Sequence, residues 1–119
     1  MPPNNPYIQK VLEDSDIMTD IESIYLKKWK WNKYFWNKNP LILEIGTGMG
    51  NFFGKQVWEN SHKNFIGMEI RYKRLFQTAE KSRKWLNQNF VMLKDFWQNI
   101  DKIFMWEEIE ETYIFFPDP

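Results

Sequence analysis

The 119-residue sequence contains no cysteine. This absence excludes disulfide bonds and thiolate metal sites, and it fits the reducing environment of the cytoplasm. His62 is the only histidine, so it has no second imidazole with which to bind a metal, and we expect none. No apolar run approaches the roughly 20 residues of a membrane-spanning helix, and the first residues lack the pattern of a secretory signal. These absences favour a cytoplasmic protein without membrane contact.

The charges also lack a dominant sign, because 16 Lys and Arg residues balance 16 Asp and Glu residues. No overall field therefore attracts nucleic acid or a membrane, and local patches must supply any such attraction. Large rings are abundant, at 18% of the residues. A chain of this length forms one domain that buries roughly two thirds of its unfolded surface. We expect aromatic rings to dominate its core.

Residues 7–36 show a helical pattern, in one or two pieces. Four large side chains recur at spacings that share a helix face: Ile21, Tyr25, Trp29 and Trp36. We interpret residues 1–40 as an N-terminal helical extension. Within it, residues 27–36 alternate cations with rings, which suits either an RNA-facing patch or an amphipathic helix packed on a sheet. We favour the packed helix.

A different pattern begins at residue 41, where short apolar runs alternate with helical segments. The runs predict strands at residues 41–45, 65–68, 90–93 and 113–116. The segments between them predict helices at residues 51–60 and 72–87, and an irregular or helical stretch at 96–106. This alternation predicts an α/β fold in which helices flank a parallel sheet.

The first strand leads into a glycine-rich loop formed by Gly46, Gly48 and Gly50. Such a loop lets the backbone approach a ligand at the start of a helix. Dinucleotide-binding loops place a third glycine three positions after the second, and here that position is Asn51. Glu44 precedes the loop, and a buried carboxylate there would repel a pyrophosphate. It suits a ligand with a positive ammonium or sulfonium group, such as S-adenosylmethionine.

Two further acids follow the next two strands. Glu69 ends the second strand, where a carboxylate can accept both ribose hydroxyls of an adenosine. Asp95 ends the third strand, where it can accept the exocyclic amine of adenine. We therefore predict a cofactor site built from Glu44, Gly46, Gly48, Gly50, Glu69 and Asp95. The alternative is that these acids are helix caps or solvated groups and that the loop is glycine-rich for steric reasons alone.

Four segments follow one another in the order and spacing of a known family: residues 43–50, 65–71, 89–95 and 115–119. They resemble the tRNA (guanine-N(7)-)-methyltransferases of the bacterial single-chain type. The resemblance implies the Rossmann-like fold of class I S-adenosylmethionine-dependent methyltransferases, with residues 41–119 as the cofactor-binding half. It also implies a guanosine in the tRNA variable loop as the substrate and Asp118 at the catalytic position.

In that family the last motif continues into Trp, Pro and a basic cluster, which this sequence lacks. We therefore interpret the chain as a fragment, completed by a missing C-terminal half or by a second chain. Guanine N7 carries a lone pair and no proton, so methyl transfer needs alignment rather than a general base, and Asp118 would act as an orienting group. Two alternatives are a methyltransferase with another substrate and an inactive cofactor-binding remnant or interaction module.

Overall fold

The computed structural model describes residues 5–83 and 89–115, which form a five-stranded sheet in the order β1-β4-β3-β2-β5. The strands are β1 (Ile17–Met18), β2 (Leu41–Ile45), β3 (Asn64–Glu69), β4 (Phe90–Lys94) and β5 (Ile109–Ile114). Every pairing between neighbours is parallel. The predicted α/β class with a parallel sheet is confirmed.

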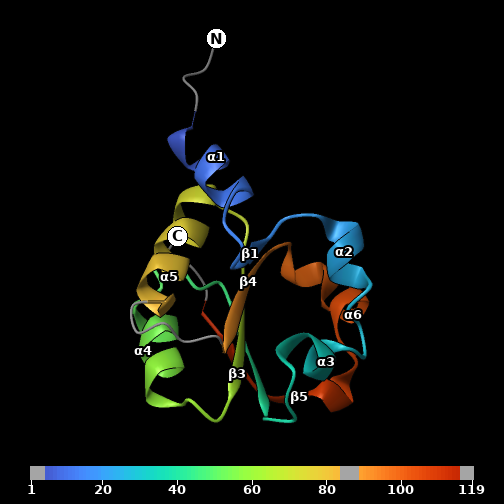
Figure 1. The fold of residues 1–119 in the computed structure, drawn as a ribbon. Coiled ribbons are helices and arrows are strands. Elements are labelled where there is room, and N and C mark those ends of the chain that lie inside the picture. The colour runs from blue at the N-terminus through green and yellow to red at the C-terminus, as the bar shows by residue number, and fades with distance from the viewer. Residues whose placement is uncertain (1–4, 84–88, 116–119) are drawn as a thin grey trace.

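Helices cover both faces of this sheet (Figure 1). One face carries α1 (Pro6–Leu12), α4 (Asn51–Glu59) and α5 (Tyr72–Ser82), and the other carries α2 (Ile21–Tyr25), α3 (Trp31–Phe35) and α6 (Ile100–Ile103). Two short 3-10 helices, η2 (Trp97–Asn99) and η3 (Trp106–Glu108), flank α6. The result is a three-layer sandwich in which the parallel strands end at one common edge.

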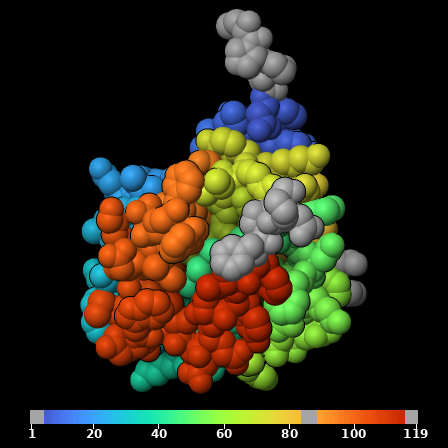
Figure 2. All heavy atoms as spheres, turned by 180° about the vertical axis from the view of Figure 1, so that it is seen from behind, coloured from blue at the N-terminus to red at the C-terminus, as the bar shows by residue number. Residues whose placement is uncertain are grey.

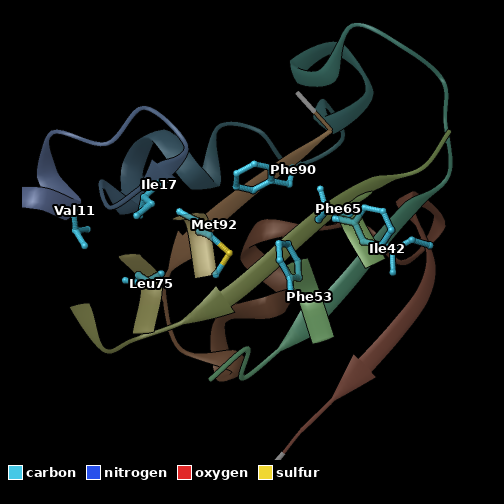
Figure 3. Packing of buried hydrophobic residues seen from close by; sticks show 10 residues of the cluster. Val11, Ile17, Ile42, Phe53, Phe65, Leu75, Phe90 and Met92 are labelled. Atoms are coloured by element: carbon cyan, nitrogen blue, oxygen red, sulfur yellow. The ribbon is translucent and has the colours of Figure 1, made fainter. Parts of the chain in front are cut away.

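Two apolar clusters fill the spaces between these layers, because successive side chains of a strand point to opposite faces of the sheet. Phe65 of β3 packs toward α4 and α5, while its neighbour Ile66 packs toward the other helices. Figure 3 shows the first cluster, where Phe53 stands edge-on to Phe65 with ring centroids 6.1 Å apart. Burial on both faces explains why the central strands read as continuous apolar runs.

The helical pattern predicted for residues 7–36 differs from the structure in two respects. Ile17 and Met18 form β1, which pairs with Met92 and Leu93 of β4 at the edge of the sheet. The helix is also interrupted after α2, because Trp29 adopts a positive φ of 73°. A tertiary contact explains the break.

That contact is made by Glu108, whose carboxylate accepts the backbone N–H groups of Trp29 at 3.0 Å and Trp31 at 3.4 Å. Trp31 is fully buried, and its indole N–H donates to the Ile103 carbonyl at 2.9 Å. The predicted packing of this segment against the sheet is therefore confirmed for Trp31. It is wrong for Trp36, whose side chain is 92% exposed.

The last strand begins earlier than predicted. The apolar run at residues 113–116 indicated the strand, yet β5 starts at Ile109 and ends at Ile114. Its first half carries exposed glutamates, Glu110 and Glu111, which an apolar run cannot reveal. These polar side chains are tolerated because β5 lies at the edge of the sheet. Residue 116 lies outside the described residues.

Candidate functional site

The carboxyl ends of β2, β3 and β4 open onto a cleft of about 730 Å³. Five of the predicted cofactor residues line it: Glu44, Gly46, Gly48, Glu69 and Asp95. Seen from behind, the green, yellow, orange and red parts of the chain that supply the lining meet near the middle of the molecule (Figure 2). The structure thus brings together three carboxyl groups from three neighbouring strands in one crevice. The predicted catalytic residue, Asp118, lies outside the described residues.

Glu44 differs from the other two acids of the cleft in its lack of hydrogen bonds within the described part of the chain. Its side chain is 3% exposed, and none of the described residues donates a hydrogen bond to it. Burial raises the pKa of Glu44 to about 8, because the charged form is poorly solvated there. A cationic group in the cleft would supply the missing interaction and favour the charged form.

Glu69, by contrast, accepts several hydrogen bonds on one of its carboxylate oxygens. Its Oε2 accepts the backbone N–H groups of Ile70 at 2.8 Å and Arg71 at 2.9 Å. The Arg71 guanidinium donates to Oε1 at 3.1 Å and to Oε2 at 3.3 Å. Burial acts to raise the pKa of Glu69, but the hydrogen bonds from Arg71 and Ile70 outweigh it, so the pKa is lowered. Oε1 retains capacity for a further donor.

The contact between Glu69 and Arg71 was not among the features expected from the sequence. The two residues are separated by one position at the junction between β3 and α5, where a turn can fold the guanidinium back onto the carboxylate. The Arg71 side chain is about half exposed at the lip of the cleft. A basic residue two positions after a strand-end acid was the available signal.

Asp95 is held by three donors from two parts of the chain. Its Oδ1 accepts the backbone N–H of Phe96 at 2.7 Å and the Asn99 amide at 2.8 Å. Its Oδ2 accepts the hydroxyl of Tyr25 at 3.0 Å. Burial, followed by the hydrogen bond to Asp95, raises the pKa of Tyr25 and keeps its hydroxyl protonated as a donor. No sequence pattern indicated Tyr25 as a partner of Asp95, which lies 70 positions away.

The three glycines of the loop have different surroundings. All have positive φ, at 76° for Gly46, 58° for Gly48 and 84° for Gly50. A Cβ at Gly46 would lie 2.5 Å from the Phe115 carbonyl oxygen, and one at Gly50 would lie 2.5 Å from the Cα of Thr78. A Cβ at Gly48 would meet nothing within 4 Å. Gly48 is therefore the glycine that faces open space, whereas Gly50 packs on α5 and does not line the cleft.

Helix α5 fixes the shape of this loop. The hydroxyl of Thr78 donates to the Gly48 carbonyl at 3.3 Å and lies 3.2 Å from the hydroxyl of Thr47. Lys81 donates to the Met49 carbonyl at 2.8 Å and to the Asn51 side chain at 2.7 Å. The loop is thus held in place before any ligand binds.

Apolar side chains complete the walls of the cleft. Phe96 and Trp97, which directly follow Asp95, line it and are more than half exposed. On the side of β5, the rings of Phe52 and Phe115 pack at a centroid distance of 5.1 Å. Flat, exposed rings beside a row of acids suit a ligand that combines an aromatic ring with hydroxyl and amine donors. The two aromatic residues after Asp95 were the available sequence signal for this wall.

Comparison with known proteins identifies the chain at the level of family. A family described as "Putative methyltransferase" matches residues 38–119, which include every strand of the cleft. The chain belongs to this methyltransferase family. Membership implies a methyl-group donor in general, and the predicted resemblance is confirmed.

Individual relatives agree with this assignment. The chain is 40% identical over 116 residues to a bifunctional glycosyltransferase/methyltransferase of Fusobacterium nucleatum, covering 97% of this chain and 18% of the relative. It is 31% identical over 107 residues to a tRNA (guanine-N(7)-)-methyltransferase of Bacillus subtilis, covering 90% of this chain and 49% of the relative. A protein of the same name from Christiangramia forsetii is 30% identical over 117 residues, covering 97% of this chain and 51% of the relative. The chain thus spans about half, or less, of the length of these relatives.

Residues 5–83 and 89–115 contain no cluster of acidic, histidine or cysteine side chains that could hold a metal ion. None of their helices has the length and apolar character needed to cross a membrane.

Proposed function

We propose that this chain carries the cofactor-binding part of an enzyme that transfers a methyl group from S-adenosylmethionine to N7 of a guanosine in the tRNA variable loop. The observation that supports it most is the single cleft lined by Glu44, Glu69 and Asp95 at the ends of three neighbouring strands. The names of the Bacillus and Christiangramia relatives supply the choice of substrate.

The residues of the cleft fit this cofactor. The carboxyl of Glu44, which receives no hydrogen bond from the described residues, suits the positively charged methionine end, because an ion inside the cleft would offset its desolvation. The free capacity on Glu69 Oε1 suits a ribose hydroxyl, and the open space at Gly48 leaves room for the ligand to approach the backbone. Phe96 and Trp97 suit contact with adenine.

When bound, S-adenosylmethionine supplies a methyl group activated by its sulfonium. Guanine N7 has an in-plane lone pair and no proton, so the protein needs to hold the base in line and at short range rather than deprotonate it. Asp118 remains our proposal for the group that orients the base. A closed active site would also require segments that correspond to the part of the relatives this chain does not cover. Further residues or a second chain would supply them. We expect the reaction to take place on tRNA in the cytoplasm.

Binding of S-adenosylmethionine, measured by isothermal titration calorimetry, tests the cofactor. We expect Glu69→Gln to weaken binding by about tenfold or more, because a charged acceptor of the ribose is lost. Glu59→Gln is the matched control, since Glu59 is exposed at the end of α4, away from the cleft lining. Absence of binding by the folded protein would instead support an interaction module without enzymatic activity.

Mass spectrometry of the oligonucleotides that a ribonuclease releases from tRNA incubated with the full-length protein tests the substrate. Formation of 7-methylguanosine in the variable loop is the expected result. The relative from Fusobacterium favours a second candidate, a methyltransferase part of a longer bifunctional protein with another acceptor. Cofactor binding without 7-methylguanosine in tRNA would select that candidate.

A further inference from the structure

The contact between Tyr25 and Asp95 links the N-terminal segment to the cleft. Tyr25 ends α2, which packs on the face of the sheet opposite α4 and α5, while Asp95 follows β4. The short strand β1 pairs with β4 and so places α2 beside the end of that strand. Tyr25 is therefore fixed beside the cleft by a part of the chain that contributes no lining residue.

The hydrogen bonds on Asp95 can be counted. An ionised carboxylate offers about four lone-pair positions, two on each oxygen. Phe96 and Asn99 fill both positions on Oδ1, and the hydroxyl of Tyr25 fills one on Oδ2. Asp95 is 6% exposed and lines the cleft, so the described residues leave one acceptor position for a ligand.

We infer that Tyr25 is a positioning residue that locks Asp95 with a single free acceptor and thereby makes the cleft select a 6-aminopurine over a 6-oxopurine. This inference rests on the proposed function, in which the cleft binds an adenosine. The amino group of adenine is a donor that matches the remaining position, whereas an oxo group presents a second acceptor to it. A site built to receive a hydrogen bond rejects an analogue that cannot supply it.

Removal of the Tyr25 hydroxyl would change how the Asp95 carboxylate is held. Without this hydroxyl, Oδ2 has two open positions, and the carboxylate is fixed through Oδ1 alone. The carboxylate can then turn or bind a water molecule when an oxo group approaches. The loss should appear as poorer discrimination between ligands rather than as a general loss of folding.

The test compares binding of S-adenosyl-L-homocysteine and S-inosyl-L-homocysteine, measured by isothermal titration calorimetry. We expect the unmodified protein to prefer the adenosyl ligand by about tenfold or more, the size of one hydrogen bond to a charged group. We expect Tyr25→Phe to reduce this ratio by at least about threefold with an unchanged melting temperature.

Tyr34→Phe is the matched control. Tyr34 comes from the same N-terminal segment and packs on Trp31, but its hydroxyl has no hydrogen-bond partner among the described residues. Its substitution should leave the ratio unchanged. If the unmodified protein and Tyr25→Phe show the same preference for the adenosyl ligand, the inference about Tyr25 is overturned and the proposed function is not affected. If the unmodified protein does not bind the adenosyl ligand, the proposed function fails and the inference fails with it.

Hydrogen exchange on the unmodified protein decides the matter if Tyr25→Phe does not fold. We expect amides of α2 to exchange more slowly with the adenosyl ligand than with the inosyl ligand at equal saturation, because only the former completes the hydrogen bonds on Asp95. Equal protection by the two ligands would contradict a role for Tyr25.

Discussion

Glu44 is the residue whose charge depends most directly on what fills the cleft. Its pKa of about 8 means that the carboxyl is largely protonated at neutral pH when no cation is present. A bound cation favours the ionised form, so its binding lowers this pKa and releases a proton. Affinity should therefore rise with pH up to about 8 and then level off. The pKa of Glu69 is already lowered, so its charge stays constant over this range.

We predict that S-adenosylmethionine binding at pH 7 releases up to about one proton and strengthens by less than about tenfold per pH unit between pH 6 and 8. Calorimetry in buffers of different ionisation enthalpy measures the proton count. Glu44→Gln should bind more weakly and release no proton. The same proton release from both proteins would show that another group titrates, and would refute the role given to Glu44.

At the residue scale, the sequence predicted which acids lie in the cleft but not how they are held. Glu44, Glu69 and Asp95 could be found because each sits at or near the end of an apolar run, and parallel strands end at one edge. The partners of the last two, Arg71 and Tyr25, could not be found in this way. Side-chain hydrogen bonds depend on local turns and on packing between distant elements, which leave no periodic signal.

The glycine loop and α5 act together at the scale of elements. Gly50 and Gly48 both have positive φ, which costs a side chain roughly 1–2 kcal/mol, but only Gly50 also faces the backbone of α5 at 2.5 Å. Gly50→Ala must therefore move α4 away from α5 or distort the loop. Gly48→Ala adds a methyl group to open space.

We predict that Gly50→Ala lowers the free energy of unfolding by more than Gly48→Ala does, and that Gly48→Ala lowers it by about 1–2 kcal/mol. Chemical denaturation measures both. The opposite order is expected for ligand binding. Gly48→Ala should weaken it more than Gly50→Ala, because the added methyl group stands where the backbone borders the cleft. Equal destabilisation by the two substitutions would mean that contact with α5 does not constrain the loop.

Elements with long apolar or helical patterns were predictable, and short ones were not. The runs at β2, β3 and β4 are buried on both faces, so their composition alone indicates strands. In contrast, β1 has two residues and exists because β4 offers it an open edge. A pattern analysis cannot recognise so short an element, since its stability comes from its partner.

At the scale of the whole molecule, the N-terminal segment before β2 is an integral part of the fold. The boundary expected at residue 40 remains a prediction, but this segment supplies β1 to the sheet and Ile24 and Trp31 to the second apolar cluster. On the face that carries α1 and α5, Arg83 at the end of α5 forms an ion pair with Asp14 of this segment at 2.8 Å. The N-terminal segment is thus joined to the sheet by pairing, packing and an ion pair.

Substitutions of two tryptophans in residues 27–36 test how much this segment contributes to stability. We predict that Trp31→Ala lowers the free energy of unfolding by about 3–5 kcal/mol, because it leaves a cavity and an unpaired Ile103 carbonyl. Trp36→Ala should change it by no more than about 0.5 kcal/mol, since that ring is almost fully exposed. Urea denaturation followed by far-ultraviolet circular dichroism measures both changes. If Trp31→Ala proved as mild as Trp36→Ala, the N-terminal segment would be an appendage whose rings are available to a partner such as RNA.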